Sequence, residues 1–127
     1  DANVLLRFIT KDPPHAAGRA QRLFRRAERG ELELRIPWLV VAEVVWVLHS
    51  YYQVARGEIA AALGAVLRAD GVKAEEAEVM VDALELMADR NVDLVDAYLS
   101  LLSARTGEPV ASFDKDFASL GVEMIAL

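Results

Sequence analysis

The chain has 127 residues, of which 54% are hydrophobic, and its net charge is −6 at pH 7. This length and composition fit one folded domain with a buried core and exclude a disordered chain. The absence of cysteine excludes disulfides, thiolate metal sites and thiol nucleophiles. No apolar run reaches membrane-spanning length and no signal-peptide pattern opens the chain, so we expect no membrane partner and a cytoplasmic location.

The first half of the chain predicts three helices and one strand. Helices are expected over Val4–Thr10, over His15–Arg29 and from Pro37 to about Tyr51, and a strand over Leu32–Ile36. Gly30 is a typical helix stop, and Pro37 is a typical first residue of a helix.

The second half continues the alternation of helices with short apolar strands. Helices are expected over Glu58–Arg68, Ala74–Asp89 and Leu94–Arg105, with a helical turn over Asp114–Ser119 and strands over Pro109–Ser112 and Val122–Ile125. This pattern indicates an α/β protein with a parallel sheet, in which helix dominates. We see no linker or repeat, so we expect a single domain over residues 1–127.

Glu43 interrupts the apolar run Leu39–Leu48. On a helix, the neighbours on its own face are all apolar, namely Leu39, Val40, Trp46 and Val47. Because an isolated buried carboxylate is costly, this pattern favours a functional role. The alternative is a glutamate at the rim of a core helix with its carboxylate in water.

The other notable acids have ordinary explanations as well as functional ones. Asp96 lies near a predicted helix start, where the helix dipole favours a carboxylate, and it shares a polar face with Asp93. Asp114 follows a predicted strand, where parallel sheets bind ligands, but aspartate also caps helices there. Asp116 lies two residues further on, and Asp1 at a chain end is ordinarily solvated. Taken one at a time, these residues leave both explanations open.

The acids Asp1, Glu43, Asp96 and Asp114 become informative as a set. Carboxylates within about 5 Å of one another repel by roughly 3 kcal/mol per pair at an effective dielectric of about 20. Such a group persists only around a cation, and oxygen ligands without Cys or His select Mg²⁺ or Mn²⁺. Because these ions activate water and neutralise phosphate oxygens, the set predicts hydrolysis of phosphodiester bonds.

Four segments carry these acids: Asp1-Ala2-Asn3-Val4-Leu5-Leu6, Pro37 to Glu43, Asp93-Leu94-Val95-Asp96-Ala97 and Ser112-Phe113-Asp114-Lys115-Asp116-Phe117. In order and spacing they resemble the PIN-domain ribonucleases, in particular the VapC-type toxins of toxin–antitoxin pairs. The resemblance covers essentially the whole chain. It implies a three-layer α/β/α fold with a central, mostly parallel sheet of four to five short strands. It also implies an RNA substrate, a Mg²⁺ or Mn²⁺ cofactor, a homodimer and a small antitoxin partner.

The resemblance assigns the catalytic acids. Asp1, Glu43, Asp96 and Asp114 correspond to the catalytic positions of the family. Asp1, Asp96 and Asp114 correspond to metal ligands, and Glu43 to a ligand or general base. In the family a strand precedes the first aspartate, whereas this chain begins at Asp1, so we expect the first strand to be truncated.

Further positions correspond to auxiliary residues of the family. Asp93 and Asp116 correspond to extra acids that some members carry, and Asn3 to an amide behind the metal ligands. Ser112 stands where threonine is common, and its hydroxyl is expected to orient Asp114.

Arg19, Arg22, Arg26 and Arg29 line one face of a predicted helix. A solvated face is the ordinary explanation for them. The alternatives are contacts to RNA phosphates, for which we select Arg19, Arg22 and Arg26, or contacts to an acidic antitoxin segment. Five aromatic residues are open to base stacking or to packing in the core or a dimer: Trp38, Trp46, Tyr51, Tyr52 and Tyr98.

The sequence therefore favours a Mg²⁺- or Mn²⁺-dependent endoribonuclease of toxin type that leaves a 5′-phosphate and a 3′-hydroxyl. One alternative is a catalytically silent PIN fold that serves as a binding module, whose mark is a lost acid, and none of the four is lost. A DNA-directed nuclease or a phosphatase with the same metal site stays open.

Overall fold

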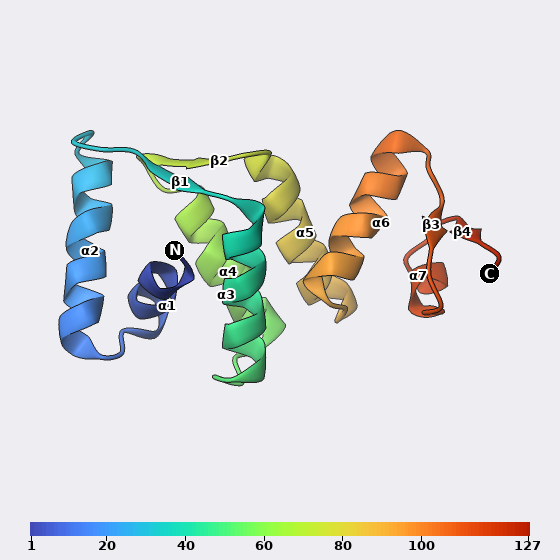
Figure 1. The fold of residues 1–127 in the computed structure, drawn as a ribbon, viewed down its shortest axis with the longest axis horizontal. Coiled ribbons are helices and arrows are strands. Elements are labelled where there is room, and N and C mark those ends of the chain that lie inside the picture. The colour runs from blue at the N-terminus through green and yellow to red at the C-terminus, as the bar shows by residue number, and fades with distance from the viewer.

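In the computed structural model, which describes residues 1–127, seven helices and four short strands follow one another along the chain (Figure 1). In chain order they are α1 (Ala2–Thr10), α2 (Pro14–Glu28), β1 (Leu34–Ile36), α3 (Trp38–Ser50), α4 (Arg56–Leu67), β2 (Val72–Ala74), α5 (Ala77–Arg90), α6 (Leu94–Thr106), β3 (Val110–Ala111), α7 (Asp116–Ser119) and β4 (Met124–Ile125). None of these helices is both long and apolar enough to cross a bilayer.

Every helix and strand expected from the sequence is present, with ends that differ by a few residues. The structure also contains one strand that the sequence did not predict, β2. The helix expected over Ala74–Asp89 begins later than predicted, because Ala74 belongs to β2 and α5 starts at Ala77. Three residues are too few to show the alternating pattern that predicts a strand, and the pairing of β2 with β1 decides its conformation.

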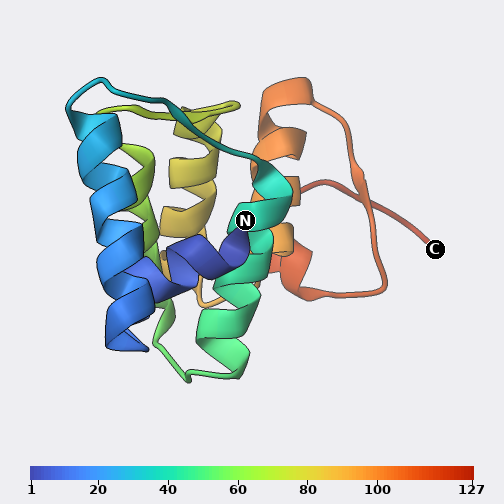
Figure 2. The ribbon, with the colours of Figure 1, turned by 60° about the vertical axis from the view of Figure 1, so that its left-hand side comes forward.

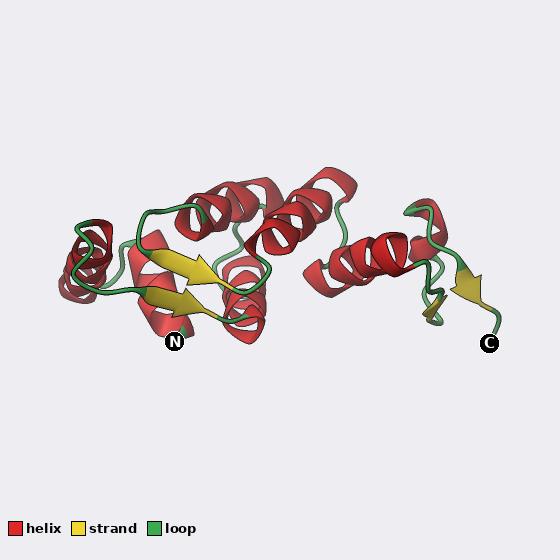
Figure 3. Ribbon diagram, turned by 90° about the horizontal axis from the view of Figure 1, so that it is seen from above, coloured by secondary structure: helices red, strands yellow, loops and turns green.

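The four strands form two separate parallel pairs (Figure 3). Leu34, Arg35 and Ile36 of β1 lie opposite Val72, Lys73 and Ala74 of β2. Val110 and Ala111 of β3 lie opposite Met124 and Ile125 of β4. The parallel direction agrees with the expected α/β architecture. The union of the strands in one central sheet of four to five strands stays a prediction, since the strands pair as two separate sheets and none joins β1 to β3.

The centre of the core lies among α3, α4 and α5. These helices supply the largest fully buried side chains: Val41, Val44, Leu48, Ile59, Leu63, Met80, Leu84 and Met87. In α3 they recur at helical spacing, so one face of that helix is buried along its length. Burial of each such side chain favours folding by about 1.5–3 kcal/mol, and these contacts hold α3 firmly against the neighbouring helices.

The C-terminal part of the chain lies on one side of this core. α6 packs against α5, and the Trp38 ring of α3 lies 4.8 Å from the Tyr98 ring of α6. Beyond α6, the strands β3 and β4 with α7 lie at the far end of the molecule from α2 (Figure 1). Phe117 is the buried apolar residue of that end. Figure 2 shows that the N-terminus lies beside α3, away from the β3–β4 pair.

Candidate active site

Four aspartates of the C-terminal part share one electrostatic environment. Asp93 occupies the N-cap position of α6, without a capping hydrogen bond from its side chain, and Asp96 lies in the first turn of that helix. Asp114 comes from the segment between β3 and α7, and Asp116 is the first residue of α7. Partial burial raises the pKa of the Asp96 carboxyl above its ordinary value, and the charges of Asp93, Asp114 and Asp116 raise it further. We call these four residues the aspartate cluster.

Local hydrogen bonds shape the loop that carries Asp114. The Ser112 hydroxyl oxygen accepts a bond from the Asp114 backbone N–H at 3.0 Å. The Asp114 Oδ1 atom in turn accepts from the Asp116 backbone N–H at 2.9 Å, at the start of α7. Ser112 therefore contacts Asp114 as expected, but through the backbone and not through the carboxylate.

Asp1 lies on the other side of α3. Its Oδ1 atom accepts from the Val4 backbone N–H at 3.3 Å and so caps α1, which is an ordinary structural use of aspartate. Asp1 is exposed and lines a cavity of about 450 Å³ together with Asn3, Arg7 and Arg19. The arginines bring positive charge to this acid, and the sequence analysis had not singled out Arg7.

Glu43 is exposed on α3, which corrects the argument for its burial. Two of the apolar neighbours on its face are exposed as well, with Leu39 at 83% and Trp46 at 68%, whereas Val40 and Val47 are half-buried against the core. Its carboxylate is therefore hydrated, and the cost of burying it does not arise. The catalytic role of Glu43 stays a prediction that rests on the resemblance alone.

The structure brings together part of the expected acid set. No three histidine or acidic side chains are arranged to hold a metal ion, and the charges that act on Asp96 include neither Asp1 nor Glu43. The donor chemistry nevertheless fits a hard cation, because the aspartate cluster is all oxygen and its members repel one another. A divalent cation bound there relieves that repulsion.

Comparison with known proteins decides the family. The family model described as PIN domain matches residues 1–123. This chain belongs to the PIN domain family. Neither the search of curated proteins nor the search of solved structures found a match. PIN domains are generally nucleases and typically use divalent metal ions, so family membership supports a nuclease-type function with nucleic acid as substrate.

The arginines proposed for RNA contact in this PIN domain are all exposed. Arg26 pairs with Glu31 at 3.1 Å, and Arg29 lies 4.0 Å from the same carboxylate, so part of this face is neutralised locally. Arg19 differs, since it shares the cavity of Asp1. Of the arginines proposed for RNA contact, Arg19 is therefore the one that shares a cavity with a candidate acid, Asp1.

Arg56 is a residue of this PIN domain that the sequence analysis missed. It opens α4, and its side chain is only 20% exposed. Its Nη2 atom donates to Asp93 Oδ1 at 2.7 Å and its Nη1 atom donates to Asn91 Oδ1 at 2.9 Å. The helix dipole disfavours a cation in the first turn of a helix, so the arginine at the start of α4 was a sequence signal that an acidic partner lies nearby. Arg56 neutralises Asp93, whereas the carboxylates of Asp96, Asp114 and Asp116 form no ion pair.

Proposed function

We propose that this PIN domain is a Mg²⁺- or Mn²⁺-dependent endoribonuclease that acts as the toxin of a toxin–antitoxin pair in the cytoplasm. The observation that carries the proposal is the aspartate cluster. Two segments that are distant in sequence bring four carboxylates into one environment, where partial burial raises the pKa of Asp96 and the charges of Asp93, Asp114 and Asp116 raise it further. In a chain of a nuclease family, a metal-binding role explains this arrangement better than a solvated helix end does.

The residues of the cluster take distinct roles. Asp96 and Asp114 hold the metal, and Asp93 and Asp116 add charge around it. Arg56 holds Asp93 in place through the 2.7 Å ion pair. When bound, the metal lowers the pKa of a water molecule and neutralises phosphate oxygens. Ser112 steadies the Asp114 backbone through its 3.0 Å hydrogen bond.

Asp1 and Glu43 are assigned to the proposed site by their sequence segments alone, because neither is among the charges that act on Asp96 in the structure. Their resemblance to the first two acids of PIN-domain ribonucleases supports Asp1 as a third ligand and Glu43 as a ligand or general base. Asn3 and Arg19 line the cavity of Asp1, where they suit support of the carboxylate and contact with a phosphate.

Incubation of the protein with labelled RNA tests the proposal. We expect cleavage with Mg²⁺ or Mn²⁺ that stops in EDTA and leaves 5′-phosphate and 3′-hydroxyl ends. Asp96→Asn and Asp114→Asn are expected to lower the rate by about 10³-fold, since each removes a proposed metal ligand. Asp70→Asn is the matched control, because Asp70 is an exposed aspartate at the other end of the molecule.

Two results contradict the proposal. Cleavage that persists in EDTA excludes a metal-dependent reaction, and an Asp96→Asn variant as active as the wild type excludes the aspartate cluster. Cleavage of single-stranded DNA in preference to RNA replaces the ribonuclease with a DNA-directed nuclease of the same chemistry.

The toxin role has its own support and its own test. A groove of about 740 Å³ among α1, α2 and α4 is lined by apolar side chains that include Phe8 and Phe24, and its basic residues (Lys11, Arg25 and Arg68) outnumber its acidic ones (Glu28 and Asp70). This combination suits an antitoxin segment that carries apolar and acidic residues. Expression of the wild type is expected to arrest growth, and expression of Asp96→Asn is not. Equal growth of the two strains contradicts the toxin role.

The homodimer also belongs to this proposal. Large apolar side chains remain exposed along the C-terminal part, with Leu102 at 38%, Phe113 at 92% and Ile125 at 47%. A second copy of the chain that covers them removes this apolar surface from water. Sedimentation at micromolar concentration is expected to give a dimer, and Phe113→Asp is expected to give a monomer. A monomeric wild type contradicts this part of the proposal.

A further inference from the structure

A cavity of about 320 Å³ lies where the end of α3 and the starts of α4 and α6 meet. We call it the α3–α6 cavity. Trp46 and His49 of α3, Arg56 of α4 and Asp96 of α6 all line it. Its volume lies at the lower end of the range of small-ligand sites, so it suits a single nucleobase and not a larger cofactor.

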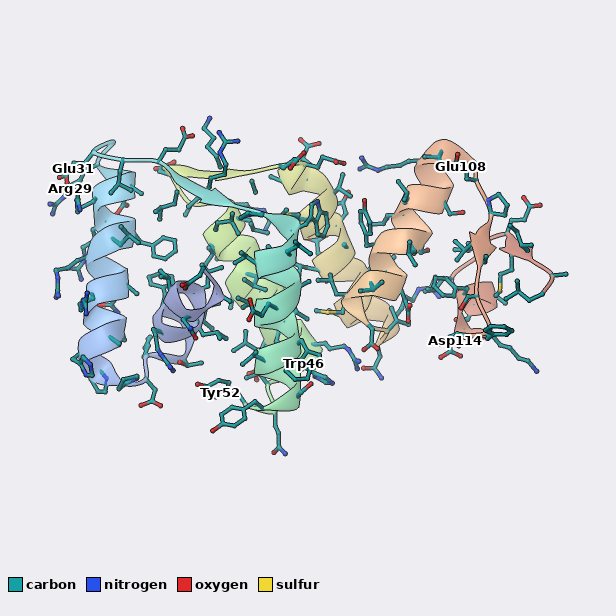
Figure 4. All side chains as sticks on the ribbon, in the orientation of Figure 1. Arg29, Glu31, Trp46, Tyr52, Glu108 and Asp114 are labelled. Atoms are coloured by element: carbon teal, nitrogen blue, oxygen red, sulfur yellow. The ribbon has the colours of Figure 1, made fainter.

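Trp46 gives this cavity a flat aromatic surface. Its side chain is 68% exposed, although indole is among the most costly surfaces to leave in water. The other tryptophan, Trp38, instead packs its ring against Tyr98 at 4.8 Å. Figure 4 shows Trp46 near the end of α3, outside the helical core. Trp46 therefore contributes little to the core and is available to stack on a ligand.

Polar groups at the cavity match the edge of a base. Arg56 uses two of its five N–H groups on Asn91 and Asp93, so three donors remain. His49 Nδ1 lies 3.4 Å from the Val54 carbonyl oxygen, which can only accept. In the neutral tautomer that donates this bond from Nδ1, the Nε2 atom is left as an acceptor. Donors and an acceptor beside an aromatic face are the elements by which proteins bind unpaired bases.

We propose that the α3–α6 cavity binds one unpaired nucleobase of the RNA substrate, stacked on Trp46 with its edge toward Arg56 and His49. This inference rests on the proposed ribonuclease function. Because Asp96 lines the same cavity, a base held there lies beside the aspartate cluster. A base within a duplex has both faces covered by its neighbours, so the cavity selects single-stranded RNA.

Tryptophan fluorescence tests the inference without metal and without cleavage. In a Trp38→Phe variant, Trp46 is the only tryptophan. Titration with a single-stranded RNA oligonucleotide in EDTA is expected to quench its emission in a saturable way, and a duplex of the same sequence is not. If Trp38→Phe does not fold, the wild type compared with Trp46→Phe gives the same information.

Binding and kinetics provide the second measurement. Trp46→Ala is expected to weaken RNA binding about 10-fold and to raise KM by a similar factor, with kcat changed less than about 3-fold. Trp46→Phe is expected to keep most of the affinity. Tyr51→Ala is the matched control, because Tyr51 is an aromatic of α3's C-terminal end that is 76% exposed and lies outside the cavity.

The outcomes separate this inference from the function on which it rests. Metal-dependent cleavage without Trp46 quenching overturns the base site and leaves the ribonuclease standing. Quenching without cleavage supports the base site and contradicts the enzyme. Emission that shifts with protein concentration, and not with RNA, shows that a second copy of the chain covers Trp46 and overturns the inference. Equal effects of Trp46→Ala and Tyr51→Ala overturn it as well.

Discussion

The helices α3 to α5 and the part of the chain from Leu94 onward differ sharply in packing. All eight of the largest fully buried side chains belong to α3, α4 and α5. In residues 94–127 only Leu94, Ala97, Ser100 and Phe117 are buried. Three members of the aspartate cluster lie in this second part, and the fourth, Asp93, immediately precedes it.

This difference follows from the chemistry that each part carries. A tight apolar core excludes water, and carboxylates that repel one another need water or a cation. The rigid helices therefore supply the wall of the candidate site, including Trp46 and Arg56, whereas the loosely packed part supplies its charge. We expect stability and activity to respond to substitutions in different parts of the molecule.

The largest expected change in stability comes from the core. Leu84 is fully buried in α5, and Leu84→Ala is expected to lower the free energy of unfolding by about 3 kcal/mol through lost burial and a cavity. Leu102→Ala makes the same chemical change in α6, where the side chain is 38% exposed, and is expected to cost less than about 1 kcal/mol. Urea denaturation measures both values. Equal losses mean that a partner covers α6 in solution and remove the contrast between the two parts.

Two glycines allow the packing of the two parts to be compared through substitutions that change the backbone. Gly71 and Gly107 both have positive φ, at +78° and +73°. A Cβ at Gly71 collides with the Ala27 carbonyl of α2, whereas a Cβ at Gly107 meets nothing within 4 Å. Gly71→Ala is therefore expected to cost about 2–3 kcal/mol, and Gly107→Ala only about 1 kcal/mol from its backbone conformation. Thermal unfolding measures the two. A Gly107→Ala variant as unstable as Gly71→Ala contradicts the looser packing of the C-terminal part.

The smallest expected effect concerns the pH dependence of the aspartate cluster. The pKa of Asp96 in the fold lies above its ordinary value of 3.8, so ionised Asp96 destabilises the folded chain. The protonated form has no such cost, and stability is lost as the pH rises from 3.8 through the pKa of the folded state. Asp96→Asn is therefore expected to stabilise the metal-free protein near pH 7, and the gain disappears toward pH 3.8.

Thermal unfolding of the two proteins across this pH range measures the effect. With Mg²⁺ present at pH 7, the wild type is expected to gain stability and Asp96→Asn is not. If the stability of Asp96→Asn changes between acid and neutral pH in the same way as that of the wild type, the charge repulsion assigned to the cluster is contradicted.

Much of the fold was predictable from the sequence, because local signals place it. Gly30, Pro37 and the apolar periods gave each helix within a few residues of its observed ends. The sequence also singled out Asp96 and Asp114, since each lies beside an apolar segment, and their catalytic roles stay predictions. The strand β2 was missed, because three residues acquire strand conformation only by pairing with β1.

Burial of individual residues was less predictable. Apolar neighbours made Glu43 look buried, yet Leu39 and Trp46 are exposed with it. Periodicity identifies a face that is rich in apolar residues but does not say whether another element covers that face. Arg56 was missed for a related reason, since its partners Asn91 and Asp93 lie 35 and 37 residues away in the chain.

The sequence by itself determined the order of the helices, the all-oxygen chemistry of the candidate ligands and the resemblance to a nuclease family that the family match then established. Only the tertiary structure decided which acids share an environment, that Arg56 pairs with Asp93, and that Trp46 borders a cavity beside Asp96. The physical reason is range. Helix and strand signals act over a few neighbouring residues, whereas repulsion, burial and cavities arise between segments that meet only after the chain has folded.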